Sequence, residues 1–190
     1  MPDTRKEKTR ARLRSAIVAE AVEKGLSGLT VGGVVARAKV SAGTVYVHFA
    51  NKDDMLRQCY LELKRAFHEA STTGRDLPDT AAMIRSMWVH MFEWVAAHPL
   101  EFLFLEQASL ANILTPEQAG EVRLYAEDIA ALLRRGVEDG TLAPLDPDVL
   151  SLLLTAPAMQ LARKAVAQGQ AISTDDVDLI FNRVWRAIAA

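Results

Sequence analysis

The sequence predicts an all-α protein that consists of a small N-terminal head of three helices and a larger C-terminal helical bundle. Apolar residues recur at helical spacing along almost the whole chain of 190 residues, and strand signals are sparse. Capping residues, prolines and glycines mark clear joints between the predicted helices. With 50% hydrophobic residues, the chain can also bury a real core.

The first helix is expected over residues 5–24. Thr4 and Glu7 stand three residues apart, which is the spacing of a capping box at a helix start. An apolar stripe at i, i+4 spacing follows and consists of Leu13, Ile17 and Ala21. Gly25 is expected to end this helix, because glycine readily adopts the left-handed conformation of a C-cap.

Two short helices follow, and a hydroxyl residue precedes each of them. Thr30 is expected to cap the first, over residues 31–38, and Ser41 the second, over residues 42–47. Their side-chain oxygens can accept hydrogen bonds from N–H groups that a helix start leaves unpaired. Because Ser41 already caps the next helix, the first short helix must end near Lys39.

A fourth helix is expected to begin after Asn51 and to continue to about Thr73. Asp54 completes a capping box with Asn51, and Gly74 and Pro78 break the helical pattern further on. The later joints predict helices near 79–97, 100–113, 116–139, 147–168 and 174–189.

Charge is distributed unevenly along the chain. The net charge is only −2, but residues 1–52 contain ten lysines and arginines against four acids, which makes +6, and residues 53–190 carry −8. A basic head on an acidic body favours a polyanion as the partner of the head, although a solvated basic helix face has the same composition. No flexible linker separates the two parts, so we predict domains 1–52 and 53–190 that join inside the fourth helix.

The two short helices behind a longer basic helix match a helix-turn-helix arrangement. In this arrangement the second helix enters the major groove of DNA, which is about 12 Å wide and admits only a slim helix. The small residues at the start of the second short helix meet this requirement, and they are Ser41, Ala42, Gly43 and Thr44. We therefore predict a DNA-binding head on residues 1–52, with double-stranded DNA as its partner.

The same stretch resembles the TetR family of bacterial transcriptional regulators, over roughly residues 10–57. The matching residues are Thr30-Val31, Ala38-Lys39-Val40-Ser41-Ala42-Gly43-Thr44-Val45-Tyr46-Val47-His48-Phe49 and Asn51-Lys52-Asp53-Asp54-Met55-Leu56. Lys39 departs from the family pattern, because it replaces the usual glycine of the turn and would have to enter a conformation that costs lysine energy. Gly32 and Gly33 replace polar residues and weaken the first short helix, and Val35 replaces an alanine.

The resemblance implies a division of roles among the residues of the head. Phosphate contacts are expected for Thr30, Tyr46, His48 and Lys52. Base-edge contacts are expected for Ala42, Gly43 and Thr44. We add Ser41, for the free N–H groups at the helix start, and Arg37, for its charge. Tyr46 could instead be a core aromatic residue, and His48 a solvated ring.

The resemblance also implies that the C-terminal bundle binds an effector and pairs two subunits. Aromatic residues and methionines gather on the helices near 79–97 and 100–113, which favours a small apolar effector, although each of them could be plain core. The candidate effector-binding residues are Trp88, Met91, Phe92, Val95, Phe102, Phe104, Tyr125 and Met159. Apolar faces on helices 116–139 and 147–168 predict an isologous homodimer, whose reading helices would meet palindromic half-sites roughly 34–36 Å apart.

These features together predict a sequence-specific DNA-binding transcriptional regulator, and most simply a repressor that a small-molecule effector releases from a palindromic operator. The alternatives are a regulator without an effector, a helical adaptor, and a helical enzyme that binds a small molecule. The enzyme is disfavoured, because the four histidines lack a metal-binding spacing and no nucleophile elbow, phosphate-cradling glycine loop or dinucleotide fingerprint is present. We expect no metal and no cofactor.

The sequence further predicts a cytoplasmic protein that does not enter the membrane. Its single cysteine, Cys59, cannot form an internal disulfide. The N-terminal residues are charged, and no apolar stretch reaches the roughly 18 residues that a membrane span needs.

Overall fold

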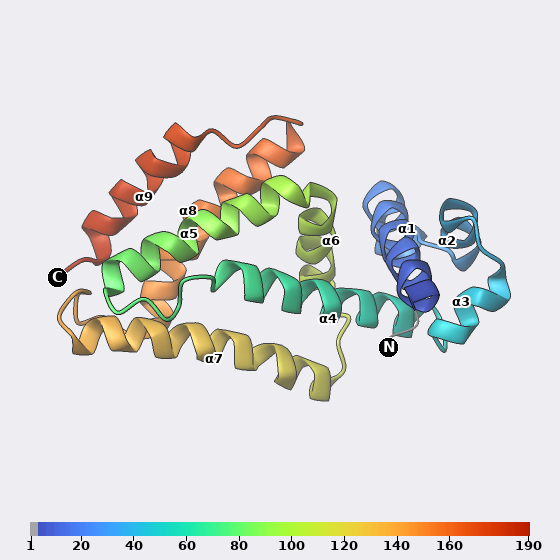
Figure 1. The fold of residues 1–190 in the computed structure, drawn as a ribbon, viewed down its shortest axis with the longest axis horizontal. Coiled ribbons are helices and arrows are strands. Elements are labelled where there is room, and N and C mark those ends of the chain that lie inside the picture. Colours follow the sequence, from blue (N-terminus) through green and yellow to red (C-terminus); the bar gives the residue numbers. More distant parts are fainter. Residues whose placement is uncertain (1–3) are drawn as a thin grey trace. The chain divides into compact units, whose positions relative to one another are not determined.

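The computed structural model describes residues 4–190. Within these residues the secondary structure is helical apart from one isolated bridge between Leu142 and Ala189, which confirms the predicted all-α fold class. Figure 1 shows the helices α1 (Thr4–Gly28), α2 (Val31–Ala38), α3 (Ala42–His48), α4 (Lys52–Ser71), α5 (Thr80–Ala97), α6 (Pro99–Leu110), α7 (Pro116–Glu138), α8 (Pro147–Ala167) and α9 (Thr174–Ile188).

The first helix is longer than the sequence predicts. Gly25 has φ 74° and ψ 161°, so regular helix geometry stops at the expected glycine, but a further turn continues to Gly28. The N–H of Leu29 donates to the carbonyl of Gly25 at 3.0 Å and closes this turn. The predicted capping box depends on the side chain of Thr4, which lies outside the described side chains.

The other helix ends follow local sequence signals. Side-chain oxygens of Asp79, Asp146 and Ser173 accept hydrogen bonds from first-turn N–H groups of α5, α8 and α9. The expected end of α6 near residue 113 is wrong, because the helix stops at Leu110 and Asn112 adopts a left-handed backbone with φ 49°.

The chain divides into two compact units. The first comprises the residues up to Arg65 together with Leu100–Thr115, and the second comprises Ala66–Pro99 together with Pro116–Ala190. The division falls inside α4, which is one continuous helix. Compactness does not decide which residues perform which function, so the predicted functional domains 1–52 and 53–190 stay a prediction.

The first unit is built around α1, beside which α2 lies in Figure 1. The predicted stripe of Leu13, Ile17 and Ala21 is fully buried. Arg10 connects α1 to α4, because its guanidinium pairs with Glu62 and donates to Oε1 of Gln58 at 3.3 Å. These contacts hold the head helices and the first part of α4 together.

The second unit packs α5, α7, α8 and α9 against one another. Gly136 of α7 lies so close to Leu142 and Thr80 that a Cβ atom there would come within 2.7 Å of the leucine side chain. The last residues pair with the loop after α7, since the N–H of Ala190 donates to the carbonyl of Thr141 at 3.1 Å. Among the described residues, no helix combines the length and the apolar character needed to cross a membrane.

Candidate nucleic-acid interface

Both predicted caps of the short helices are formed. Oγ1 of Thr30 accepts from the N–H of Gly33 at 3.0 Å, and Oγ of Ser41 accepts from the N–H of Thr44 at 3.1 Å. The hydroxyls of Ser41 and Thr44 are also hydrogen-bonded to each other at 2.9 Å. Each cap satisfies an N–H group that the helix start would otherwise leave unpaired. The start of α3 is therefore a regular and well-defined helix terminus.

The two sides of α3 have opposite environments. Val45 is 1% exposed and Phe49, just after the helix, is 5% exposed, so this side anchors α3 in the head. Ser41, Ala42 and Gly43 are exposed at the helix start. Tyr46 is 58% exposed, so it is not a core aromatic residue. The exposed end is slim enough for the major groove of DNA.

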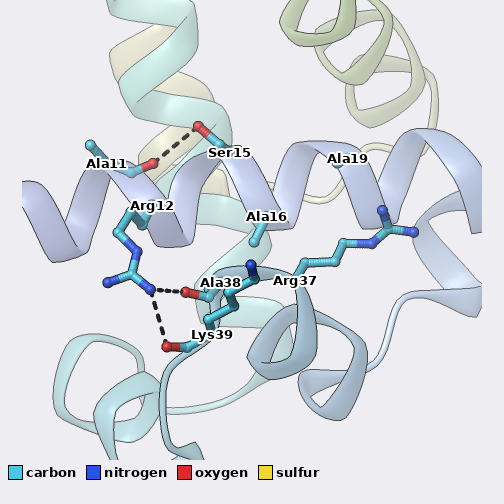
Figure 2. Close-up of a pocket in the computed structure, with 8 residues that line it drawn as sticks. All are labelled: Ala11, Arg12, Ser15, Ala16, Ala19, Arg37, Ala38 and Lys39. Carbon is cyan, nitrogen blue, oxygen red and sulfur yellow. Dashed lines mark hydrogen bonds between the residues drawn. The ribbon is translucent and has the colours of Figure 1, made fainter.

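The turn between α2 and α3 has the left-handed conformation that we expected from the family's glycine at this position. Lys39 has φ 51° and ψ 49°, which is left-handed. Nη2 of Arg12 donates to the carbonyl oxygens of Ala38 at 2.5 Å and of Lys39 at 3.1 Å. A groove of about 560 Å³ lies between α1 and the end of α2. Figure 2 shows the Arg12 side chain among the residues that line it. The groove is lined by Ala11, Arg12, Ser15, Ala16, Ala19, Arg37, Ala38 and Lys39.

Arg37 is engaged within the protein. Its Nε lies 2.6 Å from Oε2 of Glu20, and its Nη2 pairs with Glu23, so α2 is tied to α1. Glu20 is only 1% exposed, and the hydrogen bond from Arg37 holds the pKa of its carboxyl group below the usual range. Arg37 would have to share its charge with two carboxylates in order to contact DNA, so this arrangement favours a structural role.

Glu20 also explains one of the two glycines in α2. A Cβ atom at Gly33 would lie 2.0 Å from Oε1 of Glu20, whereas a Cβ atom at Gly32 would meet nothing within 4 Å. A side chain at position 33 would therefore displace the buried carboxylate of Glu20, whereas one at position 32 would displace nothing.

The last two predicted phosphate contacts lie on either side of Phe49. His48 is partly exposed, and burial, followed by the charges of Arg10 and Lys6, lowers its pKa. Nζ of Lys52 donates to the carbonyl of Ser27 at 2.9 Å, so this lysine also closes the end of α1. An ammonium group has three donors, and two of them remain for a phosphate.

The candidate effector-binding residues are distributed over both units. Phe102 and Phe104 are buried in α6 of the first unit. The other six belong to the second unit, where Trp88, Met91, Phe92 and Val95 are buried in α5, and Tyr125 and Met159 are partly exposed. Nε1 of Trp88 donates to the carbonyl of Val177 at 3.3 Å. Among the described residues, no three His, Cys, Asp or Glu side chains are grouped so that they could hold a metal ion.

Two family models match this chain. Residues 13–59 match the model of bacterial regulatory proteins of the tetR family, and residues 82–189 match the tetracyclin repressor-like C-terminal domain. The chain belongs to the TetR family. The first match contains the whole helix-turn-helix described above, and a regulator of this family binds DNA through that element.

Individual relatives of this TetR-family regulator agree with the assignment. It is 27% identical over 169 residues to an uncharacterized HTH-type transcriptional regulator of Haemophilus influenzae, with 87% of each chain covered. It is 30% identical over 152 residues to an HTH-type transcriptional repressor of Streptomyces coelicolor, covering 78% of this chain and 76% of that one. A TetR family transcription regulator from Marinobacter aquaeolei has the same fold, with a TM-score of 0.87, 21% identity and 97% of each chain covered.

Two residues that make contacts between the helices of this TetR-family head were not singled out by the sequence analysis. Glu20 is an acid next to the apolar stripe of α1, and that position was a signal of a buried, paired carboxylate. Arg12 had no local signal, because its partners lie 26 and 27 residues away. The only hint was the unusual Lys39 in the turn.

Proposed function

We propose that this TetR-family regulator is a repressor, which binds a palindromic operator as a homodimer and which a small apolar molecule releases. DNA binding is supported above all by the environment of α3. The start of this helix is exposed and capped, and Val45 anchors the helix in a head of net charge +6. The repressor of Streptomyces coelicolor among its relatives supports repression as the mode of action. Bacterial DNA as the partner implies a cytoplasmic protein.

In the proposed complex, the start of α3 lies against base edges and residues around it contact phosphates. Ala42, Gly43 and Thr44 would meet base edges, with the N–H groups beside Ser41 near a phosphate. The further phosphate contacts are Thr30, Tyr46, His48 and Lys52, each of which is exposed or partly exposed. Arg37 is the weakest member of this interface, because it is paired with Glu20 and Glu23.

Pairing of two subunits through α7 and α8 is the second part of the proposal. Leu150, Ala158 and Ala165 of α8 are buried inside the protomer, so they are not available to a partner. The opposite side of α8 exposes Val149, Leu152 and Leu153, and α7 exposes Leu124. Exposed leucines on a helix surface are typical of a subunit interface.

Release by an effector is the third part. The aromatic side chains of α5 form an apolar interior in the second unit, where Trp88 contacts Phe92 and Phe181 with ring centroids 5.6 and 5.4 Å apart. α4 runs without a break from the head into this unit, so a displacement at its C-terminal end would reach its first turn. We infer a binding role and no enzymatic activity, because the matched relatives are transcriptional regulators.

Selection of bound duplexes from a random DNA pool tests the proposal. We expect a palindromic sequence with half-sites about one helical turn apart, bound with an affinity that falls steeply as salt rises. Absence of any salt-sensitive binding to duplex DNA would refute the proposed function. In a subsequent screen, at least one apolar small molecule should lower the affinity of the protein for the selected duplex. If no molecule in the screen does so, the alternative of a regulator without an effector is favoured.

A further inference from the structure

The turn of the helix-turn-helix is held by a residue from another helix. Its backbone is left-handed at Lys39, a conformation that glycine enters freely and lysine does not. No glycine relieves the turn, since Val40 and Ser41 complete it before α3 starts at Ala42.

The backbone groups of this turn divide into two sets. The N–H groups of Lys39 and Val40 both donate to the carbonyl of Val35. The carbonyl groups of Ala38 and Lys39 point the other way, and Nη2 of Arg12 on α1 donates to both of them. Figure 2 shows the Arg12 side chain reaching across from α1 to these two oxygens. A charged donor therefore closes the end of α2 where the sequence lacks a glycine.

The contact of Arg12 with the turn bears on the angle between α2 and α3 more than on the folding of the head. α2 is already fixed to α1 through Arg37 and Glu20, and α3 is anchored by Val45. The angle between α2 and α3 depends on the few backbone dihedrals of the turn. Water can replace Arg12 at the exposed Lys39 carbonyl, so loss of the guanidinium would widen the range of turn conformations more than it would unfold the head.

We propose that Arg12 is a positioning residue for sequence recognition: by clamping the turn at Ala38 and Lys39, it sets the orientation of α3 and thereby the discrimination between operator and other DNA. This inference rests on the proposed operator binding. A reading helix without side chains for bidentate base contacts depends strongly on its backbone position, because small residues recognise bases only at close approach. Arg12 contributes to specificity without touching a base.

The test compares Arg12→Ala with Arg14→Ala in the full-length protein. Both variants remove one positive charge from an exposed position of α1, but no hydrogen bond from Arg14 to the turn is present. The probes are a duplex selected by the wild-type protein and a scrambled duplex of the same composition, and the readout is the ratio of their dissociation constants. We expect this ratio to fall about tenfold for Arg12→Ala and to stay within about twofold of the wild type for Arg14→Ala. The affinity for the scrambled duplex should fall equally in both.

A rescue experiment separates positioning from a phosphate contact and from loss of stability. Glycine at position 39 holds the left-handed turn without a clamp, so Arg12→Ala combined with Lys39→Gly should recover the ratio to within about threefold of Lys39→Gly alone. Equal ratios for Arg12→Ala and Arg14→Ala, or no recovery in the double variant, would overturn the inference. If the wild-type protein itself prefers no selected duplex, operator binding fails and the inference fails with it; the other outcomes concern Arg12 alone.

Discussion

Gly32 and Gly33 are adjacent residues of α2, yet the folded head treats them differently. Sequence rules assign both the same cost, because glycine weakens a helix relative to alanine. The structure separates them, since only Gly33 faces the buried carboxylate of Glu20. A residue that looks like a helix defect is therefore part of the packing between α1 and α2.

Alanine substitutions at the two glycines should change the free energy of unfolding in opposite directions. Gly33→Ala is expected to lower the free energy of unfolding by about 1–3 kcal/mol, because its Cβ would overlap Glu20. Gly32→Ala is the matched control and should raise it by up to about 1 kcal/mol, because its Cβ meets open space. Urea unfolding measures both, and equal stabilities of the two variants would contradict the close approach.

His48 should make DNA binding depend on pH. Burial and the charges of Arg10 and Lys6 lower its pKa in the free protein, whereas a phosphate at the ring would raise it. Binding would then take up a proton at each head, so operator affinity should rise as the pH falls from about 8 to about 6.5, by at most about tenfold per pH unit for each of the two His48 residues in the dimer.

His48→Gln is the control for this pH dependence, because it keeps a polar side chain that does not titrate. Its affinity should change less with pH than that of the wild type when binding is followed by fluorescence anisotropy. Stability moves in the opposite direction, since a lowered histidine pKa favours the neutral folded form and stability declines as the pH falls. Identical pH profiles for the two proteins would remove His48 from the interface.

At the scale of elements, α4 has a separate anchor in each unit. In the first unit Arg10 of α1 pairs with Glu62. In the second unit Nε2 of His68 lies 3.0 Å from Oδ2 of Asp128 on α7, and the ring of His68 stacks on Tyr125 with centroids 4.5 Å apart. Arg75, after α4, donates to the same Asp128 at 2.7 Å. Asp128 is thus the acceptor that holds the C-terminal end of α4 to α7.

Asp128→Asn should loosen this end of α4. The hydrogen bond from Arg75 lowers the pKa of Asp128, so the stabilisation is present at neutral pH and is lost as the pH falls through the acidic range. We expect the free energy of unfolding at pH 7 to drop by about 1–2 kcal/mol. The difference from the wild type should begin to shrink near pH 4, the ordinary pKa of an aspartate, and should vanish only below the lowered pKa of the folded state. Glu127→Gln, at an exposed neighbouring position, is the control and should have little effect. A pH-independent difference would exclude the charge as its cause.

At the scale of the whole molecule, the proposed function requires two copies of the chain. Leu152 is 64% exposed on α8 and lies in the proposed pairing face, whereas Leu179 is 54% exposed on α9 outside it. Leu152→Glu should therefore yield monomers in sedimentation experiments, and Leu179→Glu should remain dimeric. Because one half-site alone binds weakly, Leu152→Glu should also lose most of its operator affinity. A dimeric Leu152→Glu protein would shift the interface away from this face.

Much of the architecture was predictable because its causes are local. Thr30, Ser41 and Asn51 cap helices through N–H groups only three residues away, and Oδ1 of Asn51 accepts from the N–H of Asp54 at 2.9 Å as expected. Interactions of this range depend on residue type and spacing alone. The helix-turn-helix, its family and the exposed start of α3 follow from such patterns.

Only the tertiary structure decided which side chains hold the helices of the head in position. The clamp of Arg12 on the turn, the fit of Gly33 against Glu20 and the pairing of Arg37 with acids all join residues that are 13 or more positions apart. No periodicity records such pairs, because they arise only when packing of α1 against α2 brings the chain segments together. For this protein the sequence determined that a reading helix exists, and the packing around it determined how that helix is held.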